Sequence, residues 1–235
     1  MHCLLCDECF VEKISWYTFF VKCHRKYICD RCEQKLSYII GEICMECGRP
    51  LEFVPASFQE DGICIDCIRW TKEEKYRSFK NRSLYMYDDD EMKEIVAQFK
   101  FRGDAELVHI FYRPFRNLFQ KHFANVSTVI AVPLSKEREI ERGFNQAELL
   151  ATCLPVKISY PSLRRRETEK QSKKTRKERV SGSNPFYFQG EEMFSEQHIL
   201  LVDDVYTTGI TVRQIGSLLY ERGAREVSSL TLCRS

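Results

Sequence analysis

The sequence lacks features that mark several common classes of protein. It contains no Gly-Lys pair, which excludes the G-x-x-x-x-G-K-[ST] loop of P-loop nucleotide-binding proteins. No apolar run approaches the roughly 20 residues that cross a bilayer. The nearest candidate, residues 14–21, is short and aromatic and is flanked by cysteines rather than by a signal-cleavage site. We therefore expect a cytoplasmic protein without membrane insertion.

Cysteine, in contrast, is concentrated at one end of the chain. Ten of the twelve cysteines lie in the first 67 residues, and without a secretory signal this favours metal binding over disulfides. Four C-x-x-C pairs have the spacing at which a tight turn directs two thiolates at one tetrahedral ion. The paired residues are Cys3, Cys6, Cys29, Cys32, Cys44, Cys47, Cys64 and Cys67.

These eight ligands predict two closed, structural zinc sites in a Cys-rich domain over residues 1–70. Sixteen residues separate the third pair from the fourth, as is usual in zinc ribbons, and 22 separate the first pair from the second. The spacing favours pairing of neighbours, but the crossed pairing and an iron–sulfur cluster stay open. Few aliphatic residues are present, so metal must supply much of the stability. Three alternative ligands are left over: Cys9, Cys23 and His24.

The remainder, residues 71–235, alternates between strand-like and helix-like patterns. Strand patterns occur at residues 84–88, 128–132, 157–158, 199–202 and 227–232. Helix patterns occur at residues 91–101, 107–123 and 210–221. This alternation with short connections predicts an α/β fold with a doubly wound parallel sheet. Ligands of such sheets bind just beyond the carboxyl ends of the strands.

One stretch at this edge carries most of the chemistry. Residues 199–202 are apolar throughout, as in a strand buried on both faces, and Asp203 and Asp204 follow them. Next comes a loop with hydroxyls and backbone N–H groups at a helix N-terminus, which is a ready anion site. Its residues are Thr207, Thr208, Gly209, Ile210 and Thr211. Two carboxylates beside a phosphate cradle suit a sugar phosphate, because the acids accept ribose hydroxyls while the loop holds the 5′-phosphate.

This stretch resembles the phosphoribosyl-pyrophosphate (PRPP) signature of the type I phosphoribosyltransferases. The resemblance implies binding of PRPP with Mg²⁺, with Asp203 and Asp204 as the catalytic pair. It also implies that the loop after residues 128–132 receives the pyrophosphate through Leu134 and Ser135. Arg138 and Arg142 follow on a predicted helix and suit a pyrophosphate by charge and fork geometry. The alternative is a solvated basic helix face partnered by neighbouring glutamates.

The net charge of +2 conceals one strongly basic segment. Residues 164–179 carry nine Lys/Arg against three Glu, a local charge of +6, so the rest of the chain has about −4. Because no apolar period is found at about residues 164–184, we expect a mobile loop within the larger domain. Its charge would attract phosphates of a nucleotide or of DNA, although a merely solvated loop has the same composition.

Several strings together resemble the ComF family of competence proteins, of the ComFC type. They are Lys100-Phe101-Arg102-Gly103-Asp104, Val132-Pro133-Leu134, Arg142-Gly143-Phe144-Asn145-Gln146, Gln171-Ser172, the acid signature and the C-x-x-C pairs. The resemblance implies a role in DNA uptake during natural transformation and PRPP binding, with the acceptor unknown. It also implies single-stranded DNA and other DNA uptake proteins as partners. Gly182 and Lys174 depart from the family pattern in the basic segment.

Three functions fit these observations. The first is a phosphoribosyltransferase, of the glycosyltransferase class, that acts on an unidentified acceptor. The second is a single-stranded DNA-binding adaptor that uses the basic segment, and its N-terminal aromatic residues are candidates for base stacking. Those residues, for which a role in the core is the favoured alternative, are Trp16, Tyr17, Phe19 and Phe20. The third is a PRPP-sensing regulator, which the sequence does not separate from the enzyme, so catalysis is left open.

Overall fold

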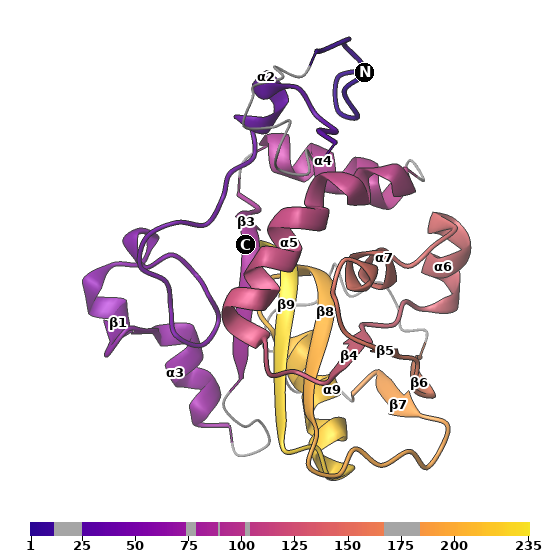
Figure 1. Cartoon of the computed structure of the whole chain (residues 1–235). Coiled ribbons are helices and arrows are strands. Elements are labelled where there is room, and N and C mark those ends of the chain that lie inside the picture. Colours follow the sequence, from indigo (N-terminus) through magenta and orange to yellow (C-terminus); the bar gives the residue numbers. More distant parts are fainter. Residues whose placement is uncertain (12–24, 74–78, 89, 102–103, 167–183) are drawn as a thin grey trace.

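The structure is a computed structural model that describes residues 1–11, 25–73, 79–88, 90–101, 104–166 and 184–235. Its centre is a five-stranded sheet, parallel throughout, with the strand order β3-β9-β8-β4-β5 (Figure 1). The strands are β3 Lys80–Met86, β9 Glu226–Arg234, β8 His198–Tyr206, β4 Thr128–Ala131 and β5 Ile158–Ser159. The predicted α/β fold with a parallel sheet is confirmed.

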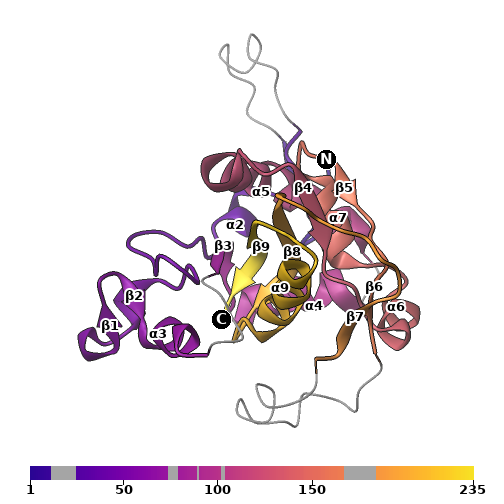
Figure 2. The same ribbon diagram turned by 90° about the horizontal axis from the view of Figure 1, so that it is seen from below.

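Helices cover both faces of this sheet. The longer ones are α4 Asp90–Phe101, α5 Val108–Phe123, α6 Lys136–Arg142, α7 Gln146–Thr152 and α9 Ile210–Glu221. Figure 2 shows α5 and α7 on one side of the sheet and α9 on the other. Successive side chains of a strand point to opposite faces. Accordingly, Leu200 of β8 packs in the core formed with α4, α5 and α7, whereas Leu201 packs in the core formed with α9.

The remaining elements of the described residues lie in the Cys-rich part and around the basic segment, except for η3, which lies between α4 and α5. They are α2 Asp30–Glu33, α3 Ile65–Thr71, three 3-10 turns (η1 Leu51–Phe53, η2 Ala56–Phe58, η3 Ala105–Leu107) and two hairpins (β1 Gln59–Glu60 with β2 Ile63–Cys64; β6 Leu163–Arg165 with β7 Phe186–Phe188). The helix patterns at residues 91–101, 107–123 and 210–221 thus correspond to α4, α5 and α9. No helix of the described ranges is long and apolar enough to cross a bilayer.

The predicted basic loop begins inside a strand, which is a correction at its first residues. Arg164 and Arg165 belong to β6 and pair with Tyr187 and Phe186 of β7. The guanidinium of Arg165 lies 5.3 Å from the centroid of the Phe186 ring. Aromatic side chains supplied by the far end of the segment therefore order arginines that look solvated in the sequence. Residues 167–183, with the family string Gln171-Ser172, lie outside the described residues.

Strand β3 starts four residues earlier than its apolar pattern predicts, because its first half is polar and buried. The Asn81 amide donates to the Cys47 carbonyl at 3.0 Å and accepts from the Ser229 hydroxyl at 2.7 Å. Ser83 Oγ lies 2.6 Å from Thr231 Oγ1 of β9. Hydrogen bonds thus replace apolar contacts here, and buried polar groups with partners carry little penalty.

The Cys-rich part covers the outer edge of β3, which would otherwise be an exposed sheet edge. The backbone N–H of Asn81 donates to the Glu46 carbonyl at 2.7 Å. Further along, the N–H of Met86 donates to the Ser37 carbonyl at 2.8 Å. Two N-terminal stretches thus extend the hydrogen bonding beyond β3. The division into domains near residue 70 stays a prediction.

Candidate functional site

The eight cysteines of the C-x-x-C pairs form two clusters. The first cysteine cluster is Cys3, Cys6, Cys29 and Cys32, and the second is Cys44, Cys47, Cys64 and Cys67. Within each cluster the four Sγ atoms all lie within 4.8 Å of one another. The structure therefore groups neighbouring pairs rather than crossed ones. Cys9 lies apart, with its Sγ 3.4 Å from His2 Nε2, and Cys23 and His24 are outside the described residues.

Both clusters suit a closed tetrahedral metal site. Backbone N–H groups donate to the sulfurs: Cys29 to Cys3 at 3.4 Å, and Cys64 to Cys44 at 3.3 Å. The pKa of Cys47 is lowered by hydrogen bonds from neighbouring thiols of its cluster, with a further contribution from the positive charge of Arg234. Four thiol ligands with such donors fit zinc, which would fill all of its coordination positions with protein ligands and serve stability rather than catalysis.

The predicted acid pair lies at the carboxyl edge of the sheet. Strand β8 continues through Asp203 and Asp204 to Tyr206, so the prediction that it ends before the acids was wrong. The reason is asymmetric pairing. Strand β4 ends at Ala131, opposite Val202, but β9 stays paired with β8 up to Tyr206. The acids are thus held in regular strand geometry on one side and lie past the end of β4 on the other.

The two acids differ in their electrostatic setting. Burial and, to a smaller extent, the negative charge of Asp204 raise the pKa of Asp203 to about 7. The backbone N–H of Asp204 donates to Asp203 Oδ1 at 2.9 Å, which partly offsets the shift. Near neutral pH the pair therefore carries less negative charge than two free carboxylates.

Two cations face Asp204. Lys100 Nζ, at the end of α4, lies 2.9 Å from Asp204 Oδ2, and Arg142 Nη1, at the end of α6, lies 3.9 Å from the same oxygen. All three side chains are largely enclosed, with exposed fractions of 15% for Lys100, 14% for Asp204 and 8% for Arg142. Burial lowers the pKa of Arg142, although Asp204 opposes this. The result is an enclosed group of opposite charges at the edge of the sheet.

Gln146 connects these two cations. Its amide oxygen accepts a hydrogen bond from Arg142 Nη1 at 2.8 Å. Its amide nitrogen donates to the carbonyl of Lys100 at 3.5 Å. Gln146 is only 1% exposed, so it holds the Arg142 guanidinium in one direction, toward the acids.

Asn145, in the string Arg142-Gly143-Phe144-Asn145-Gln146, contacts the loop after β4. Its side chain caps α7 by accepting from the N–H of Ala147 at 3.0 Å, and it donates to the carbonyl of Val132 at 3.1 Å. Gly143, with a φ of 77°, ends α6 between Arg142 and this cap. The Arg-Gly-Phe-Asn-Gln string therefore has a local explanation: it turns the chain between two short helices and fixes the cation.

The loop between β8 and α9, here the β8–α9 loop, consists of residues 207–209. It brings together all the predicted phosphate-loop residues at the start of α9. Gly209 has a φ of 76°, and Thr208 Oγ1 accepts from the N–H of Ile210 at 3.4 Å. The side chain of Ile210 is buried, so this residue can offer only its backbone. Thr207 is exposed and Thr211 is half-buried.

The loop after β4 reaches the same edge. Leu134 is half-buried, and Ser135 is 7% exposed and precedes the first turn of α6. Arg138 lies on the exposed side of α6, so the structure does not place it in the enclosed group around Asp204. Burial lowers the pKa of Arg165 on β6, and the like charges of Arg138 and Arg142 lower it further. Arg165 is thus a further cation near the acids.

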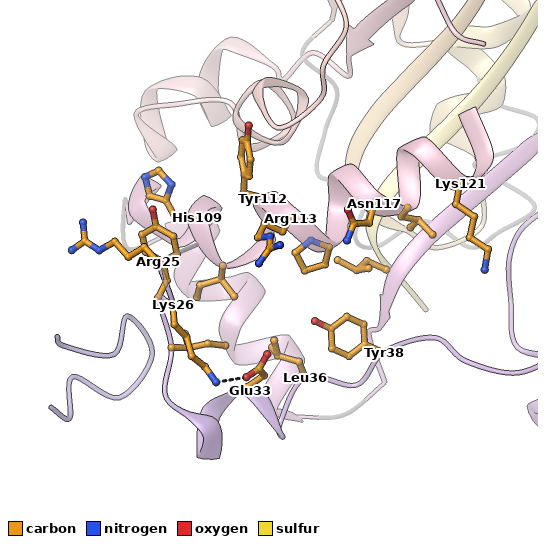
Figure 3. Close-up of a pocket in the computed structure, with 16 residues that line it drawn as sticks. Arg25, Lys26, Glu33, Leu36, Tyr38, His109, Tyr112, Arg113, Asn117 and Lys121 are labelled. Atoms are coloured by element: carbon orange, nitrogen blue, oxygen red, sulfur yellow. Dashed lines mark ion pairs between the residues drawn. The ribbon is translucent and has the colours of Figure 1, made fainter. Parts of the chain in front are cut away.

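A second polar surface lies between α5 and residues 25–38, around a pocket of about 1010 Å³ (Figure 3). On α5 its lining includes a stripe of residues spaced by four: His109, Arg113, Asn117 and Lys121. Arg25, Lys26 and Tyr38 line the opposite wall, where Lys26 Nζ pairs with Glu33 Oε2 at 2.6 Å. The described lining holds four Lys/Arg and one acid. We call this surface the α5 groove, and its charge is positive.

Comparison with known proteins identifies the family. Residues 140–235, which include the acid pair and the β8–α9 loop, match the phosphoribosyl transferase domain. The chain is 41% identical to the competence protein ComFC of Bacillus subtilis over 237 residues, covering 99% of this chain and 95% of that protein. The chain belongs to the ComFC family of competence proteins. The ComFC protein of Streptococcus pneumoniae is 29% identical over 235 residues and is covered completely, as is this chain.

More distant similarities accompany those to ComFC proteins. The DNA utilization protein YhgH of Escherichia coli K12 is 36% identical over 117 residues, which are 46% of this chain and 49% of that protein. Among solved structures, a hypoxanthine phosphoribosyltransferase of Staphylococcus aureus is 12% identical, with 56% of this chain and 65% of that chain covered and a TM-score of 0.37.

Some residues at the site of this ComFC family member are not assigned by the sequence pattern. Lys100 occurs in a family string. However, it lies at the end of a helix, and the sequence does not predict that it pairs with Asp204. Arg165 is hidden in a run of basic residues. Gln146 carries no signal beyond its string. The contacts of Lys100 with Asp204, of Arg165 with Phe186 and of Gln146 with the Lys100 carbonyl join elements far apart in the sequence, and local periodicity holds no information about them.

Proposed function

We propose that this chain binds PRPP with Mg²⁺ at the carboxyl edge of the sheet and works in DNA uptake during natural transformation. The observation that carries the proposal is the convergence of Asp203, Asp204, Arg142 and the β8–α9 loop at one edge. The match to the phosphoribosyl transferase domain supports the ligand. The similarity to competence proteins over the whole chain supports the process.

Each group has a part in this proposal. Asp203 and Asp204 accept hydrogen bonds from the ribose hydroxyls, and N–H groups of the β8–α9 loop bind the 5′-phosphate. Arg142 and the backbone of Leu134 and Ser135 receive the pyrophosphate. Carboxylate and phosphate oxygens are the ligands that Mg²⁺ prefers, and the ion, when bound, offsets phosphate charge while keeping several waters.

Lys100 has a more specific part. Its ammonium neutralises Asp204 at 2.9 Å. A ligand that brings both a divalent cation and a pyrophosphate offers each member of this ion pair a new partner. Asp204 then contacts the ribose or the cation, and Lys100 turns to the phosphate oxygens. The ion pair keeps the enclosed charges matched until the ligand arrives.

The first prediction concerns Asp204. Asp204→Asn is expected to weaken PRPP–Mg²⁺ binding at least about tenfold, because a charge-assisted hydrogen bond contributes roughly 1.5–3 kcal/mol. Calorimetric titration of the folded, zinc-loaded protein measures this. The matched control is Asp90→Asn, the same change at a fully exposed side chain on α4. Equal affinities of the wild type and Asp204→Asn would contradict the assignment of Asp204, and absence of binding by the wild type would end the proposal.

Group transfer is a further step at the same site. It would break the bond between ribose C1 and the pyrophosphate oxygen and form a bond from C1 to an acceptor, through an oxocarbenium-like transition state. The protein would mainly orient the groups and stabilise charge. A sensor needs the same binding groups, so the proposal is limited to binding. Acceptor-dependent release of pyrophosphate distinguishes the enzyme from the sensor.

A second function, binding of single-stranded DNA, is favoured by the α5 groove. Its cations are spaced along one helix face, and the exposed tyrosines Tyr38 and Tyr112 offer rings at its wall, with exposed fractions of 40% and 39%. Phosphates and bases are bound by this combination of cations and aromatic rings. The proposal moves the DNA contact from the basic segment, where the sequence suggests it, to α5.

The second prediction tests this location by salt dependence. Arg113→Gln with Lys121→Gln is expected to reduce the slope of log affinity against log salt by about 1.4, since each single-strand phosphate contact contributes about 0.7. The control removes the same charge at two exposed residues outside the groove, by Arg225→Gln with Lys93→Gln. A third variant neutralises the basic segment at Lys173, Lys174, Arg176 and Lys177. If only the third variant changes the slope, the groove is not the DNA site.

A further inference from the structure

The second cysteine cluster and the β8–α9 loop are connected through the side chains of neighbouring residues. Helix α3 starts immediately after Cys64 and includes Cys67, and its Trp70 faces the loop. Trp70 Nε1 donates a hydrogen bond to the carbonyl of Thr208 at 3.2 Å. The indole is 5% exposed and packs against Ile210, the first residue of α9. A residue of the cluster's own helix thus holds the backbone of the loop.

A second connection runs through Arg234 at the end of β9. Its Nη2 lies 3.6 Å from the sulfur of Cys47, and its Nη1 donates to the carbonyl of Tyr206 at 3.3 Å. Arg234 is 2% exposed. A single buried guanidinium therefore spans from a cluster thiol to the residue that precedes the loop.

Arg213 of α9 contacts Tyr206, the residue that precedes the β8–α9 loop. Its Nη1 donates to the hydroxyl of Tyr206 at 2.6 Å, and its guanidinium lies 4.8 Å from the centroid of the Trp70 ring. Its Nη2 is 3.9 Å from Glu46 Oε2, and Glu46 lies between Cys44 and Cys47 in the sequence. Glu46 and Trp70, which neighbour the cluster cysteines in the sequence, therefore supply a negative charge and an aromatic ring to the Arg213 guanidinium.

We infer that the metal ion held by the second cysteine cluster fixes the conformation of the β8–α9 loop, with Trp70 as a positioning residue. This rests on the proposed function, because the consequence is a coupling between metal binding and PRPP binding. The first cysteine cluster packs with α4 and α5 instead. Coupling is expected at one metal site of the two.

Coupling between two binding sites is reciprocal. If the second metal ion tightens the loop for PRPP, then bound PRPP must hold that ion more firmly. A colorimetric zinc chelator, titrated into zinc-loaded full-length protein until equilibrium is reached, measures the affinity for both ions. Saturating PRPP–Mg²⁺ is expected to tighten the binding of one ion about tenfold and leave the other unchanged. This measurement on the wild type needs no variant.

Trp70→Phe tests the route of the coupling. It keeps an aromatic ring but removes the N–H, so the Thr208 carbonyl loses its partner. PRPP affinity is expected to fall about tenfold, and most of the protection of the second ion should disappear. Arg69→Gln on the same helix is the control, since that side chain is 60% exposed and pairs with Asp66. Two bound zinc ions and cooperative unfolding show that each variant is folded.

The possible outcomes separate the inference from the proposed function. A wild type that does not bind PRPP in calorimetry overturns the proposed function, and the coupling with it. A wild type that binds PRPP but holds both ions with unchanged affinity overturns the coupling alone. Equal protection in the wild type and Trp70→Phe overturns the role of Trp70. Protection of one ion that depends on Trp70 supports the inference.

Discussion

Replacing Gly209 by alanine is expected to remove nearly all PRPP binding, with a loss of about a hundredfold or more, roughly 2.7 kcal/mol. Gly209 has a φ of 76°, which is unfavourable for residues with a Cβ. The added Cβ would overlap the Tyr206 hydroxyl and the Arg213 guanidinium. Both side chains are buried, with exposed fractions of 3% and 2%. The backbone of the loop must therefore move, and its N–H groups lose their positions.

Gly41→Ala is the matched control for this change. Gly41 has a φ of 77°, and a Cβ placed there meets no atom within 4 Å. It imposes the same backbone strain without the overlap, so its effect should be limited to about 1–2 kcal/mol of stability. Calorimetry gives the affinities, and thermal unfolding shows whether the Gly209→Ala protein is folded. Unchanged affinity of Gly209→Ala would rule out the β8–α9 loop as the phosphate site.

Cys64→Ser is expected to remove one zinc ion and to lower the unfolding temperature strongly. Structural zinc contributes most of the folding free energy of small metal-stabilised modules, so we expect a loss of at least about 5 kcal/mol. For a chain of this size, that is a fall of about 10 °C or more. Loss of zinc from the second cysteine cluster would also break the hydrogen bond from Asn81 to Glu46. The edge of β3 would then be uncovered, so aggregation should increase.

The control for this prediction is Cys9→Ser. Cys9 is exposed and lies outside both clusters, so its replacement should leave the zinc content and the unfolding temperature unchanged. Zinc is counted by a colorimetric assay after denaturation, and aggregation is followed by light scattering during heating. Full zinc content in Cys64→Ser would mean that the second cluster is not a metal site.

Apolar patterns make much of this fold predictable from the sequence. The patterns at residues 91–101 and 210–221 are close to the bounds of α4 and α9, because an amphipathic helix buries one face along its whole length. The apolar run at residues 199–202 identifies β8 for a similar reason. Its sides are both covered by helices, so no polar residue interrupts it. The spacing of the C-x-x-C pairs favours the grouping of thiols that the structure has.

Polar residues that are buried with partners were not predictable. Asn81 and Ser83 precede the apolar strand pattern at residues 84–88, yet they lie in a strand whose hydrogen-bond partners come from Cys47 and from β9. The end of β6 looks solvated for a related reason, since Arg165 lies over the ring of Phe186, which follows much later in the chain. Lys100 likewise pairs with Asp204, a residue far from it in the sequence. A sequence pattern reports the local environment of a residue, and these contacts are all long-range.

The strand order has a consequence for synthesis of the chain. Strand β9 lies between β3 and β8 in the sheet, although it follows both in the sequence. Until β9 leaves the ribosome, β3 has no strand of the sheet to pair with, and the five-stranded sheet cannot form. Domains generally fold as units during synthesis, and here the unit closes late. Early loading of zinc would give the nascent Cys-rich part its own order during that interval, so zinc supply and folding of this protein should be linked in time.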